Sequence, residues 1–105
     1  MSSDNQYTLS FNTQIALVLR AVRTALAWSQ KDLAIKAGIS KPTIARIESM
    51  TISPRADTIN NIMIVFRTKG VEIDILADEI IIRFKKTALL ELQNNLATPK
   101  PSKDK

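Results

Sequence analysis

The sequence contains neither cysteine nor histidine, and it has only two glycines and five aromatic residues among its 105 positions. Disulfide bonds are therefore excluded, and a zinc site or a nucleophile paired with an imidazole would lack its usual side chains. No closely spaced pair of acidic residues lies beside a glycine-rich loop that could hold a phosphate group. We therefore expect no catalytic site, no metal and no cofactor, and hence no enzyme.

Long apolar runs are also missing, because no stretch approaches the roughly 18 residues that a membrane-spanning helix needs. The first six residues are polar and do not resemble the charged start and apolar segment of a signal peptide. These absences predict a cytoplasmic protein without membrane contact. The content of 45% hydrophobic and 24% charged residues is typical of one globular domain with a single modest core.

The net charge of +5 is concentrated in one third of the chain. The segment 20–55 contains seven basic and two acidic residues, whereas the remainder contains eight of each sign. A basic excess confined to one segment favours a surface that binds a polyanion, since each neutralised phosphate releases a condensed counterion. Charge alone would equally suit a solvated face that only aids solubility.

Apolar periodicity and capping residues predict two helices in the first third of the chain. Apolar residues at helical spacing predict a first helix over about 13–26, with Thr13 as its cap. Ser29, followed three residues later by Asp32, has the spacing of a capping box. This pair predicts a second helix over about 30–37.

Two further helices follow after a sharp turn. Gly38 offers the permissive backbone that a helix end with a tight turn requires. Ser40 lies eleven residues after Ser29 and is likewise a favourable helix cap. It predicts a third helix over about 41–49, with a proline confined to the first turn of that helix. After a loop, Asp57 is the expected cap of a fourth helix that runs to about residue 70.

The periodicity changes after residue 70. Alternating β-branched residues from Val71 and a second such run over 79–84 predict a β-hairpin with Ala77 and Asp78 in its turn. Both faces of this hairpin are expected to be largely apolar. A shorter helix over about 86–96 then follows. The competing interpretation is one long helix over 78–97, because the apolar residues there also fit helical spacing.

Two short helices joined by a three-residue turn are typical of a helix-turn-helix unit, which needs a small residue at the helix crossing and a glycine in the turn. Ala34 and Gly38 supply these features. The segment SQKDLAIKAGISKPTIARIE resembles the Cro and phage-repressor family, also called the xenobiotic response element family, and the resemblance extends over residues 13–70. It implies a mainly α, lambda-repressor-like bundle, here followed by the hairpin and a final helix. Met50 stands where the family usually has glycine.

The resemblance implies that the third helix reads bases and that the start of the second helix contacts the DNA backbone. The implied base-contacting residues are Lys41, Pro42, Thr43 and Arg46. The implied phosphate contacts are Ser29 and Gln30, and additional attraction is expected from Lys31, Lys36 and Arg55.

Two residues of this region are expected to be structural. The resemblance implies that Glu48 pairs with Arg23 of the first helix and thereby ties the reading helix to the scaffold. Trp28 is interpreted as a core anchor at the end of the first helix rather than as an aromatic that stacks on a base.

The chain is thus expected to comprise a flexible arm (1–10), a helix-turn-helix domain (11–70), a segment of hairpin and helix (71–97) and a disordered tail (98–105). Isolated helix-turn-helix units bind weakly, so a homodimer through 71–97 is expected to read two half-sites on double-stranded DNA. Alternatively, this segment covers the helical core within one chain.

These features predict a sequence-specific transcriptional regulator, a repressor that occupies a pseudo-palindromic operator; in the family such proteins are commonly phage, plasmid or mobile-element regulators of bacteria. The alternative is a partner-binding protein, an antitoxin or adaptor whose C-terminal segment binds a toxin or another regulator. A stable symmetric dimer in solution would favour the first hypothesis, and an aggregation-prone monomer the second.

Overall fold

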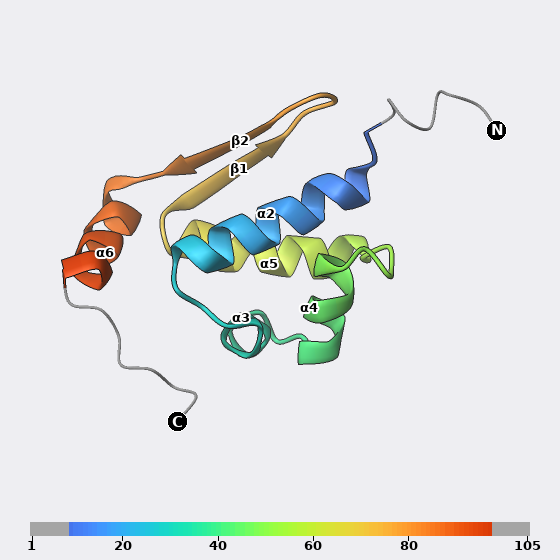
Figure 1. Ribbon diagram of the computed structural model, residues 1–105, viewed down its shortest axis with the longest axis horizontal. Coiled ribbons are helices and arrows are strands. Elements are labelled where there is room, and N and C mark those ends of the chain that lie inside the picture. The colour runs from blue at the N-terminus through green and yellow to red at the C-terminus, as the bar shows by residue number, and fades with distance from the viewer. Residues whose placement is uncertain (1–8, 98–105) are drawn as a thin grey trace.

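The computed structural model describes residues 9–97, and it shows helices gathered on one side of a single hairpin (Figure 1). Apart from residues 9 and 10, the expected flexible arm lies outside the described residues, as does the whole of the expected tail. In chain order the elements are α2 (Phe11–Ala25), α3 (Gln30–Ala37), α4 (Lys41–Glu48), α5 (Ala56–Thr68), β1 (Val71–Ile75), β2 (Ile80–Phe84) and α6 (Lys86–Ala97). The predicted fold class is confirmed, and the alternative of one helix over 78–97 is wrong.

Two of the predicted helix caps are wrong. Helix α2 begins two residues earlier than expected, because Ser10 is its cap and accepts a hydrogen bond from the backbone N–H of Thr13 at 3.1 Å. Helix α5 begins after Arg55 and has no side-chain cap, so that Asp57 lies inside the first turn. A carboxylate there still interacts favourably with the positive end of the helix dipole, which explains why the sequence pattern resembled a cap.

The predicted capping box at the start of α3 is confirmed in full. The Ser29 hydroxyl accepts from the N–H of Asp32 at 3.0 Å, and the Asp32 carboxylate accepts from the N–H of Ser29 at 2.8 Å. Gly38 ends α3 in the left-handed conformation with φ +68°, as predicted for the turn. Ser40 caps α4, and its hydroxyl accepts from the N–H of Thr43 at 3.3 Å.

The first four helices enclose one apolar core. Its largest fully buried side chains on these helices and their links are Ile15, Leu19, Leu26, Leu33, Ile44, Ile47, Ile62 and Phe66. Trp28 is 7% exposed, and its ring centroid lies 6.3 Å from that of Phe66. The interpretation of Trp28 as a core anchor is therefore confirmed.

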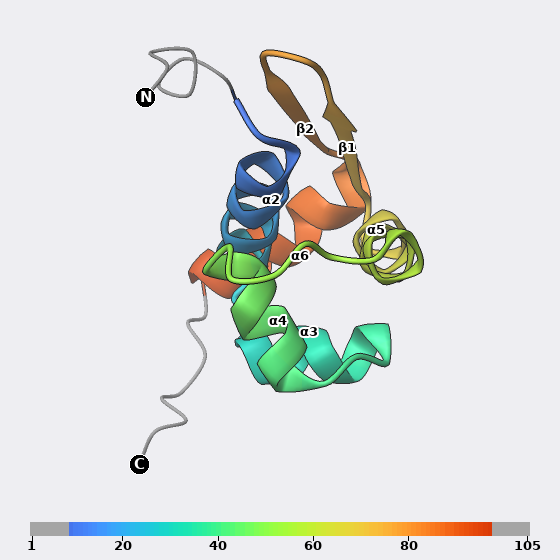
Figure 2. The same ribbon diagram turned by 90° about the vertical axis from the view of Figure 1, so that its right-hand side faces the viewer.

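The hairpin lies over α2 and α5, and its turn is close to the N-terminal end of α2 (Figures 1 and 2). Strands β1 and β2 are antiparallel, in a register that pairs Val71 with Phe84 and Ile75 with Ile80. The buried Gln14 of α2 fastens the hairpin, because its amide donates to the carbonyl oxygen of Leu76 at 2.7 Å.

Only one face of the hairpin is uniformly apolar, which corrects the expectation of two apolar faces. The apolar face packs on the helical core within the chain and comprises Val71, Ile73, Ile75, Ile80, Ile82 and Phe84. On the other face Arg83 donates to Asp74 at 2.6 Å, and Lys85 lies 3.8 Å from Glu72. The alternation of residue types along β1 could have revealed this, but the run of isoleucines in β2 concealed it.

Within residues 9–97, no helix combines the length and apolar character needed to cross a membrane. In the same range, acidic side chains do not gather in a group of three that could hold a metal ion.

Candidate nucleic-acid interface

Helices α3 and α4 form the helix-turn-helix unit, and α4 lies at the surface of the molecule (Figures 1 and 2). The turn is closed by the N–H of Ile39, which donates to the carbonyl of Ala34 at 2.9 Å. Ala34 is 5% exposed, and its small side chain lets the two helices approach closely. The turn therefore fixes the direction in which α4 leaves α3.

Helix α4 has one buried and one exposed face. Ile44 and Ile47 point into the core and are essentially inaccessible to water. The residues expected to contact bases lie on the other side: Lys41, Pro42 and Arg46 are exposed and Thr43 is half-buried. The Thr43 hydroxyl lies 2.8 Å from that of Ser40, so it already has one hydrogen-bond partner within the cap.

An ion pair fastens α4 to α2 on the inner side. Arg23 donates through Nε to Glu48 Oε2 at 2.8 Å and through Nη2 to Glu48 Oε1 at 3.0 Å. Its third donor, Nη1, reaches the carbonyl oxygen of Trp28 at 2.9 Å. The side chain of Glu48 is only 5% exposed and that of Arg23 is 19% exposed. This bidentate geometry fixes α4 relative to α2 and to the start of α3.

Gln30 belongs to the same network, a role that the sequence analysis missed. Its side-chain amide donates to Glu48 Oε1 at 3.0 Å. Three elements therefore meet at one carboxylate: α2 through Arg23, α3 through Gln30 and α4 through Glu48 itself. The spacing of the residues along the chain gave no signal for this contact, because it depends on the angle at which α3 crosses α4.

The start of α3 is exposed and carries the positive end of a helix dipole. In the capping box Ser29 donates through its backbone N–H and accepts through its hydroxyl oxygen, so the backbone N–H groups that an anion there would meet are those of Gln30 and Lys31. Lys31 is exposed beside them. The backbone N–H of Ser29 is therefore already paired, contrary to the expectation that it is open to a phosphate, whereas its hydroxyl can still donate.

Lys36 and Arg55, the two remaining cations expected to attract DNA, lie away from the start of α3. The ammonium of Lys36 is 5.0 Å from the centroid of the Trp28 ring and borders a groove between α3 and α5. Arg55 donates to Asp57 at 3.3 Å on the exposed side of α5. That hydrogen bond, together with the charge of Arg55, lowers the pKa of Asp57 below its ordinary value.

Arg20 is one of the seven basic residues of the segment 20–55, but no DNA contact was predicted for it from the sequence. It is exposed, and it borders a surface hollow of about 310 Å³ with Gln30 of α3 and Ser49 after α4. The available signal was its position three residues before Arg23, because residues at that spacing share one face of a helix.

Met50, at the position where the family usually has glycine, adopts a left-handed backbone conformation. Its φ is +60°, so the chain leaves α4 through a left-handed turn in spite of the side chain. The Thr13 hydroxyl donates to the Met50 sulfur at 3.3 Å, which holds this exit against α2. Ala27, after α2, is a second non-glycine residue with positive φ, at +61°.

A short helix pair with a glycine turn, an exposed second helix and basic side chains around it defines a DNA-binding protein of the helix-turn-helix class. Comparison with protein families matches residues 19–73, more than half of the chain, to the helix-turn-helix family. The chain belongs to this family, in its Cro and phage-repressor (xenobiotic response element) type, and is a DNA-binding transcriptional regulator. A comparison with curated proteins found no match.

Proposed function

We propose that the protein is a sequence-specific repressor that binds a pseudo-palindromic operator as a homodimer and blocks transcription by occupying it. The observation that carries this proposal is the division of α4 into a buried apolar face and an exposed polar face. Ile44 and Ile47 hold the helix in place, while Lys41 and Arg46 extend into solvent where a major groove would lie.

The exposed residues of α4 supply the chemistry for reading bases. Arg46 and Lys41 donate hydrogen bonds and match the two acceptors, O6 and N7, that guanine presents in the major groove. Thr43 offers its methyl group and the remaining capacity of its hydroxyl. Pro42 has no N–H and makes apolar contact, for which the methyl group of thymine is the natural partner.

Contacts to phosphates fix the protein on the duplex. The N–H groups of Gln30 and Lys31 at the start of α3 bind one phosphate, and Ser29 positions them through the capping box. Arg20 adds a cation at the adjoining hollow. Lys36 and Arg55 contribute longer-range attraction, which weakens as the salt concentration rises.

The segment 71–97 provides the dimer interface in this proposal. The apolar face of the hairpin covers the core, so most of the exposed large apolar side chains of the segment lie on α6, and Leu76 at the hairpin turn is 43% exposed. Leu89, Leu90 and Leu96 are 52%, 50% and 83% exposed. Pairing of two copies through these leucines would hide them from water and place two α4 helices on half-sites about 34 Å apart.

The proposal is tested with Arg46→Ala on an operator selected from a random duplex pool. We expect a loss of about 1 to 3 kcal/mol in specific binding and relaxed preference at one base pair. Lys31→Ala should weaken binding equally on the operator and on random DNA and lower the salt slope. Arg67→Ala is the matched control, since this exposed arginine lies on α5 beside the hairpin, away from α4. Equal losses on both DNAs for Arg46→Ala would show that α4 does not read bases.

The exposed leucines of α6 also favour a second candidate, in which this helix binds a different protein, as in an antitoxin or an adaptor. Light scattering after size exclusion separates the two. A symmetric dimer that Leu89→Glu converts to a monomer supports the repressor, whereas a monomeric wild-type protein that still binds DNA supports the partner-binding alternative.

A further inference from the structure

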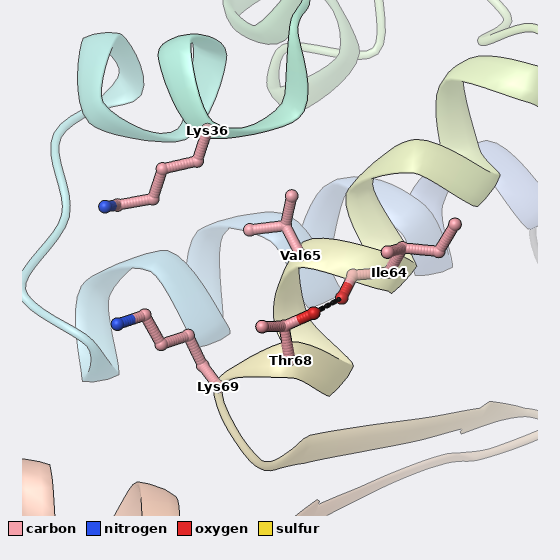
Figure 3. A pocket seen from close by; sticks show the side chains of 5 residues that line it. All are labelled: Lys36, Ile64, Val65, Thr68 and Lys69. Atoms are coloured by element: carbon pink, nitrogen blue, oxygen red, sulfur yellow. Dashed lines mark hydrogen bonds between the residues drawn. The ribbon is translucent and has the colours of Figure 1, made fainter.

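A groove between α3 and α5 shares only Lys36 with the DNA-binding proposal, in which this lysine supplies longer-range attraction. It consists of two adjoining hollows of about 360 and 390 Å³ that share Lys36, Ile64 and Val65 in their walls. Figure 3 shows the first hollow, with Lys36 extending from α3 and Lys69 from the end of α5. These volumes are at the lower end of the range of about 300 to 1,000 Å³ that is typical of small-molecule sites.

The floor of the groove is apolar and accessible. Ile35 on α3 is 69% exposed and Ile64 on α5 is 43% exposed, and they line the same hollow. Val65 lies half-buried between the two lysines. Apolar side chains gathered in a concave site bind the apolar part of a ligand, because their contact removes both surfaces from water.

Two cations stand at one end of this floor. In Figure 3 the Lys36 and Lys69 side chains extend toward the same side of the hollow from its two walls. The ammonium of Lys36 rests over the Trp28 ring at 5.0 Å from its centroid, which restricts its position. The ammonium of Lys69 lies 3.7 Å from the Glu91 carboxylate of α6, a long and half-exposed ion pair. The residues that line the two hollows include no acidic side chain.

We propose that the groove binds a small amphiphilic carboxylate, with its apolar body along Ile64 and Val65 and its carboxylate between Lys36 and Lys69. The charge complementarity defines the ligand class: an apolar floor alone would accept neutral molecules, whereas two ammonium groups at one end select an anion. The bound carboxylate takes the place of Glu91 as the partner of Lys69. Glu91 is therefore a competitor of the ligand within the same chain.

The test uses the full chain without DNA and titrates it with decanoate below its micelle concentration in a calorimeter. We expect saturable binding of one decanoate per chain, accompanied by a change in the fluorescence of Trp28, the single tryptophan of the sequence. Lys69→Gln should weaken decanoate binding about three- to tenfold, the effect of one partly exposed charged contact. Glu91→Gln should strengthen decanoate binding, because the ligand then no longer competes with the Glu91 carboxylate for Lys69.

Lys86→Gln is the matched control, since this exposed lysine of α6 lies outside the residues that line the groove, and it should leave decanoate binding unchanged. Decanol, which has the same apolar body without the charge, should bind at least tenfold more weakly. Absence of saturable binding would overturn the proposal. So would equal affinities for decanol and decanoate, or equal losses in Lys69→Gln and Lys86→Gln, which would indicate detergent-like association. Because no DNA is present, failure here is separate from failure of the operator-binding proposal.

Discussion

Removing Arg23 should destabilise the protein far more than removing any exposed arginine. The Glu48 side chain is only 5% exposed, and in Arg23→Met its carboxylate loses both guanidinium hydrogen bonds, at 2.8 and 3.0 Å. Gln30 is then its remaining side-chain donor in the network. Breaking a buried ion pair by removing one partner typically costs about 3 to 5 kcal/mol. A domain of this size has about 5 to 15 kcal/mol of stability, so the loss is a large share of it.

Urea denaturation followed by circular dichroism measures this loss. Arg83→Met is the control, because its pair with Asp74 at 2.6 Å has both side chains about half exposed. Exposed pairs contribute about 0 to 1 kcal/mol, so the control should unfold close to the wild type.

A double variant separates the cost of an unpaired charge from the value of the pair. In Arg23→Met with Glu48→Met no charge is left in the interior, and the stability should return to within about 1 to 2 kcal/mol of the wild type. Specific DNA binding should nevertheless remain weaker, because the bidentate contact that orients α4 is gone. Two results would contradict this role of the pair in fastening α4. One is a loss of less than about 1 kcal/mol in the free energy of unfolding of Arg23→Met, and the other is additive effects of the two substitutions on that free energy.

Three further predictions concern the backbone and one surface carboxylate. Met50→Gly should raise the free energy of unfolding by about 0.5 to 1 kcal/mol, since its φ of +60° disfavours a side chain, and an unchanged urea midpoint would contradict this. Gly70→Ala should cost more than Gly38→Ala in thermal unfolding, because an added Cβ at Gly70 would collide with the first turn of α6, whereas at Gly38 it meets no atom; equal losses would refute the contact. Arg55 lowers the pKa of Asp57 by its hydrogen bond and its charge, so this contribution to stability is present above the ordinary carboxyl pKa and disappears as the pH falls through the lowered value. The melting temperature of Asp57→Asn should accordingly be lower than that of the wild type near pH 7 and equal to it near pH 2. A difference in melting temperature that persists in acid would contradict this role of Asp57.

Local sequence signals were sufficient for most of the helices. The box of Ser29 and Asp32, the glycine at position 38 and the cap at Ser40 each act within four residues, so their outcome did not depend on distant parts of the chain. The predictions of the caps of α2 and α5 were wrong because they too relied on local signals alone. Several polar residues near each start could satisfy a free N–H, and the pattern did not distinguish among them.

The sequence by itself determined the element order, the turn that joins α3 to α4 and the division of α4 into an apolar and a polar face. The position of Gln30 against Glu48, the contact of Lys36 with Trp28 and the groove beside Lys69 were decided by tertiary structure alone. Periodicity reports which side of an element is apolar, but it carries no information on the angle between two packed helices. Contacts between residues far apart in the chain depend on that angle, which is set by the fit of side chains across the whole core.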